Sequence, residues 1–232
     1  MKDNFLFDLN IPEEKEEYKN SKSDILRFLK DIGVDTRYVS IWENKIYINN
    51  LRFSKFSKRR QNNFELKFKS QKVIRSSLFQ EIATNASREL SKTIKPKMKI
   101  LIKKDVNPLI NILLEPYTRK YGVKLVLDEN EEYDVIASKL TLDMKIHLIC
   151  NNIFKGKGIN YPVFDKNYIY PLIKVTNKQI NDFLGGKILE EKYNDISGEF
   201  IEFLDETVTQ YKFNILKSVE YLEENQLNSN IK

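Results

Sequence analysis

Cations spaced among aromatic rings are the residues of this sequence best suited to chemistry with phosphates. Residues 51–60 read Leu-Arg-Phe-Ser-Lys-Phe-Ser-Lys-Arg-Arg, so that Lys55, Lys58, Arg59 and Arg60 alternate in part with two phenylalanines. Lysine and arginine neutralise phosphates, and aromatic rings stack on bases. The segment is therefore a candidate nucleic-acid-binding site. The alternative is an exposed strand whose phenylalanine side chains face the core.

A second basic segment combines lysine with glycine. Lys155, Gly156, Lys157 and Gly158 follow a predicted helix. Glycine at the end of a helix is first of all a C-cap, because it adopts the left-handed conformation without strain. A basic turn beside the ligand-binding edge of a sheet is also a reasonable phosphate contact. We therefore include Lys155 and Lys157 among the predicted nucleic-acid-binding residues.

The residue types needed by a catalyst do not form a recognisable set. The lone histidine, His147, falls in a predicted helix, where a packing or surface role is expected. Cys150 is the only cysteine, which excludes an internal disulfide or a cysteine-based zinc site. Residues 72–77 lack the glycine-rich loop with which backbone amides close around phosphates. We predict no catalytic residues, no cofactor and no metal.

The charge of the chain is unevenly distributed. The net charge is +6, but residues 51–97 carry thirteen Lys/Arg against three Glu, whereas residues 190–224 carry ten acids against three Lys. The basic part attracts polyanions and the acidic part repels them. The alternative is that many of these lysines only form a solvated face.

Composition indicates a globular protein. The chain has 232 residues, of which 41% are hydrophobic, enough to bury a core. No stretch approaches the roughly 18 consecutive apolar residues of a membrane span, and the acidic N-terminal residues lack the pattern of a signal peptide. We expect a cytoplasmic protein without a membrane partner.

The elements that must position these residues follow a regular order between residues 71 and 188. Strands alternating with helices predict a doubly wound, mostly parallel α/β sheet. Strands are expected at 72–76, 98–102, 123–127, 134–138 and 168–172, and helices at 78–90, 106–120, 142–153 and 176–184. Ligands bind at the carboxyl ends of such strands, so the loops near Ser76, Ser138 and Lys155 are expected to share an edge.

Two smaller regions flank the predicted sheet domain. Residues 1–70 predict a small α+β lobe with a polar lead-in, a helix at 23–32 capped by Ser23, and a hairpin at 38–48. Residues 189–232 predict a helical region. Its apolar stripe needs cover from the sheet domain or from a partner chain, and comprises Phe200, Leu204, Val208, Tyr211, Ile215, Val219 and Leu222.

Several segments in order resemble one family, the non-catalytic second subunit of the cytosolic tRNA thiouridylase, a degenerate relative of the PP-loop ATPases. Residues 134–158 are similar to its strand, its Thr-containing loop and a helix ending in Gly-Arg-Gly, with Lys157 in place of the arginine. Residues 168–172 and 178–180 resemble its Arg-Pro-Leu strand and Lys-Glu-Ile helix. Residues 196–204, and 214–218 with Leu222, resemble its C-terminal Phe-Ile-x-x-Leu and Thr-Ile-Phe-Arg-Thr segments.

The resemblance covers roughly residues 71–225 and implies a function. It implies a degenerate PP-loop fold and a heterodimer with a catalytic thiouridylase that helps bind tRNA for 2-thiolation of the wobble uridine. A ubiquitin-like modifier would donate the sulfur. Residues 72–77 would be the eroded ATP loop, and the family's N-terminal cysteine pairs are missing here. A stand-alone nucleotide-dependent α/β enzyme and a general RNA-binding module remain open as alternatives.

Overall fold

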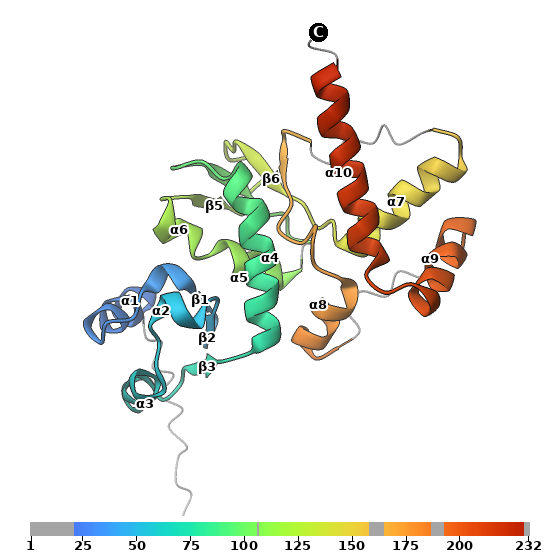
Figure 1. Ribbon diagram of the computed structural model, residues 1–232. Coiled ribbons are helices and arrows are strands. Elements are labelled where there is room, and N and C mark those ends of the chain that lie inside the picture. Colours follow the sequence, from blue (N-terminus) through green and yellow to red (C-terminus); the bar gives the residue numbers. More distant parts are fainter. Residues whose placement is uncertain (1–20, 106, 158–164, 187–192, 230–232) are drawn as a thin grey trace, which may run out of the picture.

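Two β-sheets and three groups of helices make up the described part of the chain (Figure 1). The structure is a computed structural model that describes residues 21–105, 107–157, 165–186 and 193–229. It has a mixed α/β architecture with a parallel sheet. Every helix in these ranges is too short or too polar to span a membrane.

The N-terminal lobe is built on a small sheet with the order β1-β2-β3. β1 (Val39–Trp42) and β2 (Lys45–Ile48) form the predicted antiparallel hairpin. Around them lie α1 (Lys22–Asp31), η1 (Thr36–Tyr38), α2 (Leu51–Ser54) and α3 (Lys58–Lys67). The lobe has its own apolar core, in which Phe56, Phe64 and Phe68 are buried.

The predicted cap of the first helix is wrong by two residues. Ser21, not Ser23, is the N-cap of α1, because its side chain accepts a hydrogen bond from the Asp24 amide at 3.2 Å. Both serines precede the same apolar stripe, and only the backbone conformation distinguishes the capping one.

β3 (Lys72–Ile74) does not join the large sheet as predicted. It pairs in parallel with β2, with Ile46 opposite Val73, and belongs to the N-terminal lobe. Val73 is buried with Phe64 and Phe68 in the core of this lobe. Three residues are too few for sequence pattern to specify their partner strand, so the choice depends on the neighbouring core.

The large sheet is parallel throughout and has the order β5-β4-β6-β7. Its strands are β4 (Lys99–Leu101), β5 (Lys124–Val126), β6 (Val135–Ala137) and β7 (Tyr168–Ile169). The helices α4 (Ser77–Thr93), α5 (Pro108–Leu114), α6 (Tyr117–Lys120) and α8 (Asn177–Leu184) contribute to its core. Thr176 is the N-cap of α8 and Gly185 its C-cap, as predicted. The helix expected at 106–120 divides at Pro116, which has no amide hydrogen to continue it.

α7 (Leu142–Phe154) packs mainly on the C-terminal helices rather than on the sheet. Leu142, Ile146 and Ile149 of its predicted stripe are buried against α9 (Ile196–Thr207) and α10 (Tyr211–Ser229). The predicted C-terminal stripe is thus covered only in part. The helix that carries this stripe is interrupted between α9 and α10, where Val208 is extended and Gln210 has a positive φ of 60°.

One buried carboxylate joins the N-terminal lobe to the sheet domain. Glu115, only 2% exposed, accepts a hydrogen bond from the Ile41 amide at 3.0 Å and pairs with Arg119 and Lys22. Burial alone would raise its pKa, but hydrogen bonds from Arg119 and Lys22 and their charges hold the pKa of Glu115 below its usual value. The ionised form therefore stabilises the contact.

We expect Glu115→Ala to lower the free energy of unfolding by about 3–5 kcal/mol, because it leaves the half-buried Arg119 without its carboxylate. The lowered pKa means that this stabilisation is present above about pH 4.5 and is lost as the pH falls further. The free energy of unfolding should therefore fall less between pH 7 and pH 4 in the variant than in the wild type. Urea denaturation at pH 7 and pH 4 measures both effects.

The matched control is Glu132→Ala, which removes an exposed ion pair with Lys99 and should leave stability nearly unchanged. Equal stability of the two variants at pH 7 would contradict the assigned role of Glu115.

Candidate nucleic-acid interface

The predicted basic residues of the N-terminal lobe lie where α2 ends and α3 begins. Lys55 ends α2 in the left-handed conformation, and the exposed side chains of Lys58 and Arg59 belong to the first turn of α3. The structure thus brings Lys55, Lys58, Arg59 and Arg60 together. A helix N-terminus carries partial positive charge, and this first turn has no acidic residue. A bound anion would reduce the electrostatic repulsion between these cations and the helix N-terminus.

Arg60 differs from its two basic neighbours because it is fixed by the fold. Its Nη1 donates a hydrogen bond of 2.5 Å to the Lys55 carbonyl. Its guanidinium also lies against Gly33, where an added Cβ would come within 2.8 Å of Nη2. Arg60 therefore fastens α3 to the end of α1.

The two phenylalanines of this segment have different fates. Phe56 is fully buried against Phe64, whereas Phe53 is 52% exposed and has the Arg52 guanidinium 5.9 Å from its ring centre. The alternative prediction of a strand is wrong, because Asn50 and Ser57 each cap a helix. One ring thus packs in the core, and the other remains available at the surface.

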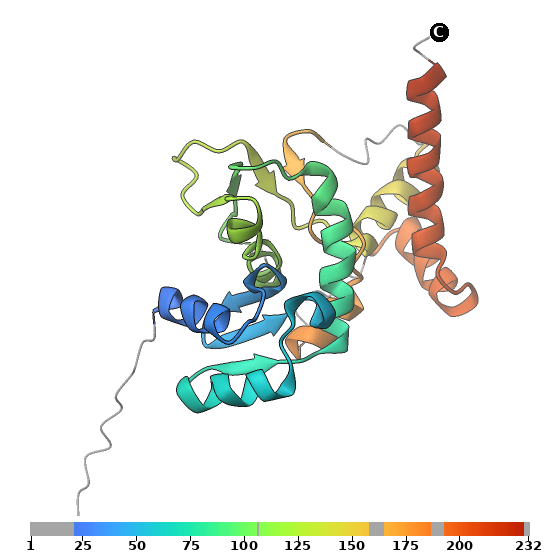
Figure 2. The same cartoon turned by 60° about the vertical axis from the view of Figure 1, so that its left-hand side comes forward.

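Lys155 and Lys157 do not join this cluster. They follow α7, which lies across the molecule from α2 and α3 in Figures 1 and 2. Both are exposed, and Gly156 between them takes the left-handed conformation expected of a helix end. The pKa of Asp195 is lowered mainly by its hydrogen bond with His147, and the charge of Lys155 contributes to the same shift. Gly158 lies outside the described residues.

The predicted common edge of three loops is also wrong. Ser76 follows β3 in the smaller sheet, and Ser138 follows β6 in the larger one. Lys155 is separated from the carboxyl end of β6 by α7, whose 13 residues span about 20 Å. Only Ser138 therefore lies at the carboxyl edge of the parallel sheet.

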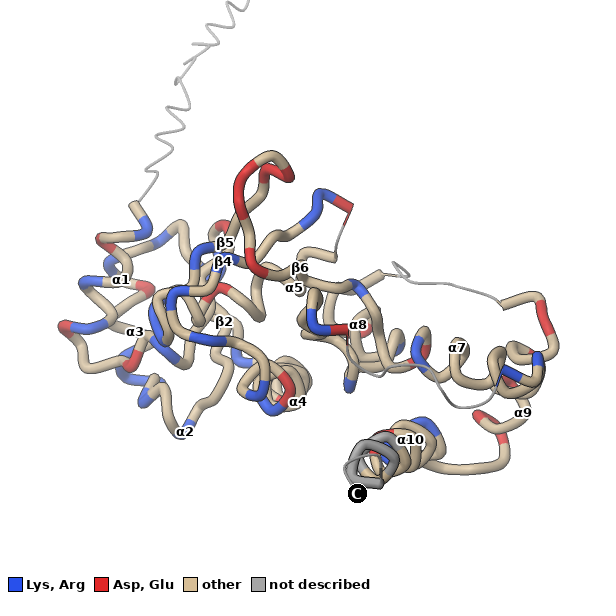
Figure 3. The backbone as a smooth tube through the Cα atoms, turned by 90° about the horizontal axis from the view of Figure 1, so that it is seen from above, with Lys and Arg blue, Asp and Glu red and all other residues tan. Residues whose placement is uncertain are grey.

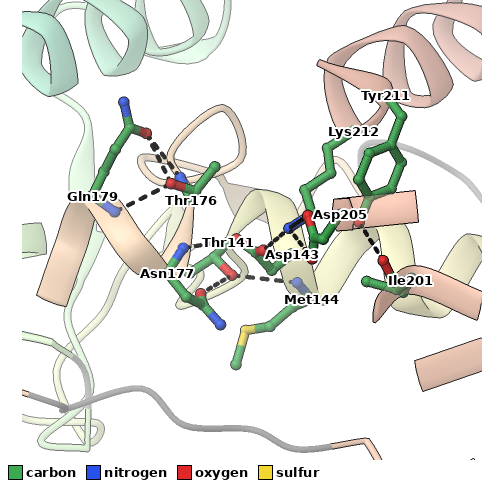
Figure 4. Close-up of polar contacts among 10 residues, drawn as sticks. All are labelled: Thr141, Asp143, Met144, Thr176, Asn177, Gln179, Ile201, Asp205, Tyr211 and Lys212. Carbon is green, nitrogen blue, oxygen red and sulfur yellow. Dashed lines mark hydrogen bonds and ion pairs between the residues drawn. The ribbon is translucent and has the colours of Figure 1, made fainter. Parts of the chain in front are cut away.

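Side chains of the protein itself occupy part of that edge (Figure 4). Thr141 donates a hydrogen bond to the Asn177 side chain at 2.7 Å, and the Asn177 amide donates to Asp143 at 2.7 Å. Lys212 from α10 binds Asp143 at 2.7 Å and Asp205 at 2.9 Å. These contacts hold the start of α7 between α8 and α10.

The carboxyl ends of β4 and β5 are acidic. A cavity there of about 720 Å³ is lined by Lys104, Asp105, Leu127, Asp128, Glu129, Asn130 and Glu131. Figure 3 shows the acidic loop between β5 and β6 in red, whereas lysines and arginines predominate along α3. Asp105 and Glu131 are paired with Lys139 and Lys124, and the remaining carboxylates, Asp128 and Glu129, outnumber Lys104. This edge is electrostatically unfavourable for a nucleotide.

His147 and Cys150, the residues weighed for catalysis from the sequence, are both buried. His147 is buried, its Nε2 lies 3.0 Å from the Asp195 carboxylate, and its ring stacks on Tyr193 with centroids 3.5 Å apart. Cys150 is buried as expected, and desolvation raises the pKa of its thiol. Within the described ranges, no three His, Cys, Asp or Glu side chains are grouped to hold a metal.

A cavity between the N-terminal lobe and the sheet domain was not predicted from the sequence. It is lined by cations and aromatic rings, including Arg37, Tyr38, Phe53, Arg88 and Lys120. The sequence drew attention only to Phe53, as part of the basic segment 51–60, because the other lining residues come from elements far apart along the chain. Docking of the two parts creates this site.

Comparisons with protein-family models, with curated proteins and with solved structures each gave no match. Fold and site together define a mixed α/β protein with a four-stranded parallel sheet, a basic N-terminal lobe and an acidic C-terminal helical region.

Arg59 and Arg60 are adjacent and carry the same charge, but only Arg60 makes a structural hydrogen bond within the described part of the chain. Replacing each in turn therefore distinguishes the effect of a lost surface charge from that of a lost structural contact. We expect Arg60→Ala to cost about 1 kcal/mol because its hydrogen bond to the Lys55 carbonyl is removed, which lowers the melting temperature by about 2–4 °C. Arg59→Ala should leave it unchanged or slightly higher, because a cation leaves the first turn of α3. Equal melting temperatures in thermal unfolding would contradict this difference.

Proposed function

We propose that this chain is a non-catalytic subunit of a tRNA 2-thiolation complex, which pairs with a catalytic thiouridylase and helps bind tRNA. The observation that carries the RNA-binding part is the cluster of Lys55, Lys58 and Arg59 at the start of α3, in a first turn without acidic residues. The tRNA-thiolation part rests on the sequence resemblance of residues 71–225.

The basic segment folds into consecutive elements that run from the N-terminal lobe into α4 of the sheet domain. Residues 51–97 span α2, α3, β3 and α4, and carry thirteen Lys/Arg against three Glu. Of these acids, Glu89 is buried and already paired with Lys92 and Lys174. The positive charge therefore remains largely uncompensated within this region, which favours binding of a polyanion.

The segment compared with the ATP loop supports a role without catalysis. Residues 72–77 form β3 and pass directly into α4, where Ser76 caps the helix by accepting a hydrogen bond from the Phe79 amide. No glycine lies between β3 and α4 to let successive amides surround a phosphate. β3 also lies outside the parallel sheet.

The C-terminal helical region supports the proposal of a partner subunit. Exposed apolar side chains lie at the end of α7, along α9 and at its C-cap, among them Ile153, Phe154, Ile196, Phe200, Phe203 and Val208. Phe154 and Phe200 contact each other with ring centroids 5.4 Å apart. Exposed Glu199, Glu202 and Glu206 lie on the same helix as Phe203. The catalytic subunit should therefore present an apolar surface bordered by basic residues.

A general RNA-binding module is the second candidate, and the same basic surface favours it. The two functions differ in specificity, since a module without a role in thiolation would bind other structured RNAs as well as tRNA.

In cells depleted of this protein, we expect wobble uridines to lose their 2-thio group while the neighbouring side-chain modification remains. Mass spectrometry of tRNA nucleosides measures both. Restoration by the wild-type chain is the control. Unchanged thiolation would reject the thiolation role and leave the RNA-binding module as the candidate.

Direct binding tests the basic cluster. Because each neutralised phosphate releases counterions, tRNA affinity should fall steeply with salt. Replacing Lys55, Lys58 and Arg59 with Ala should lower the slope by about one unit for each phosphate that is no longer neutralised. Fluorescence anisotropy at several salt concentrations measures the slope. A slope unaffected by these changes would exclude the cluster from the interface.

The partner surface makes a separate prediction. Replacing Phe200 and Phe203 with Ser should abolish co-purification with a co-expressed catalytic thiouridylase, because these rings supply apolar contact area. The matched control is Leu127→Ser, which changes an equally exposed apolar residue after β5. If both proteins retain the catalytic subunit, α9 is not the docking surface.

A further inference from the structure

The cavity between the N-terminal lobe and the sheet domain has a volume of about 300 Å³. One wall comes from η1, the residues after β2, and α2. The other comes from the middle and C-terminal half of α4, the end of α5, and α6 with the preceding Pro116. Its lining residues are Arg37, Tyr38, Asn49, Asn50, Phe53, Ala83, Thr84, Ala86, Ser87, Arg88, Leu90, Ser91, Leu113, Pro116, Tyr117 and Lys120. The volume is at the lower end of the roughly 300–1,000 Å³ of small-molecule sites.

Among the described residues, the lining contains three cations and no carboxylate. Asp35, outside the lining, neutralises Arg37 through two hydrogen bonds of 3.0 and 2.7 Å. Lys120 Nζ lies 5.5 Å and 5.3 Å from the ring centres of Tyr117 and Tyr121, an interaction that leaves its charge in place. The Arg88 guanidinium has no ion pair or hydrogen bond with any described residue. Arg88 and Lys120 are thus available to an anion.

An exposed aromatic ring forms part of the wall. Phe53 lies with its ring centre 5.3 Å from that of Tyr38, at an interplanar angle of 32°. Half of the Phe53 side chain remains in contact with solvent. A flat heterocycle that covers this ring would gain both stacking and apolar burial.

Polar groups near the ring can contact the edge of such a heterocycle. Asn49 Oδ1 accepts a hydrogen bond from Ser40, and Asn50 Oδ1 accepts one from the Phe53 amide. These bonds fix both amide groups, and leave their nitrogens as donors. Apolar Leu113 and Pro116 belong to the same lining.

We propose that this cavity binds one nucleotide unit, with its base stacked on Phe53 and its phosphate held by Arg88 and Lys120. The chemistry of the ligand follows from the cavity alone, whereas a tRNA strand as its source rests on the proposed function. The unit belongs to an RNA strand with an unstacked base or is a free mononucleotide. The cavity lies along the second half of α4, away from Ser76 and the segment compared with the ATP loop.

Binding by the full chain tests the proposal with two probes, a fluorescent tRNA transcript and free UMP or AMP measured by calorimetry. Arg88→Ala and Phe53→Leu should each weaken binding about tenfold, because one removes the phosphate contact and the other the stacking surface. The controls Arg27→Ala and Tyr133→Leu remove an exposed cation and an exposed ring elsewhere. Both should bind like the wild type, and melting temperatures verify folding.

The outcomes separate the cavity from the proposed function. Loss of tRNA binding in both cavity variants supports the cavity with an RNA strand as source. Mononucleotide binding that depends on Arg88 and Phe53, without tRNA binding, supports the cavity and rejects the RNA-binding role. Wild-type tRNA binding that neither variant changes, without mononucleotide binding, overturns the cavity proposal alone. No binding of either probe overturns both.

Discussion

The buried pair of Glu115 and Arg119 is the contact on which the relative placement of the two sheets depends. Glu115 accepts a hydrogen bond from the Ile41 amide in β1. Arg119 donates hydrogen bonds to the carbonyls of Thr36 and Val39 at 3.0 and 2.7 Å. A charge pair withdrawn from water is tolerated only when hydrogen bonds satisfy it, and here backbone groups of the N-terminal lobe do so. The lobe therefore docks in one orientation. That orientation places η1 and α2 opposite α4 and α6, and so creates the cavity.

A second set of charges organises the C-terminal side. Lys212 lies between Asp143 and Asp205 and so joins α7, α9 and α10. Burial alone would lower the pKa of its ammonium, but the hydrogen bonds that it donates to these two carboxylates raise that pKa, so Lys212 is charged at neutral pH. α7 consequently packs on the helices of the tail, and the tail is part of the fold rather than an appendage.

These two arrangements give the molecule two chemically different ends. Cations and an exposed ring lie on the N-terminal lobe and along α4, and exposed apolar side chains with carboxylates lie on α9. Figure 2 shows the N-terminal lobe and α9 on opposite sides of the molecule. Polyanion and protein partner would therefore approach without competing for the same surface. The separation of the ends also explains why Lys155 and Lys157, which follow α7, cannot act with Lys58 and Arg59 on one phosphate.

The sequence by itself determined the local elements and the parallel α/β class. Periodic apolar residues, the cap Thr176 and the glycine Gly185 fix helices through interactions within a few residues, and these were predicted correctly. Lys58 and Arg59 were predicted to bind nucleic acid, and the structure places both side chains at the surface. Only the tertiary structure decided the partner of β3, the break between α9 and α10, the burial of Phe56 beside the exposed Phe53, and the cavity. The physical reason is the separation in sequence of the residues that interact. Helix caps and apolar periodicity depend on residues a few positions apart. Strand pairing, docking of the lobe and the convergence of Phe53, Arg88 and Lys120 depend on contacts between residues tens of positions apart.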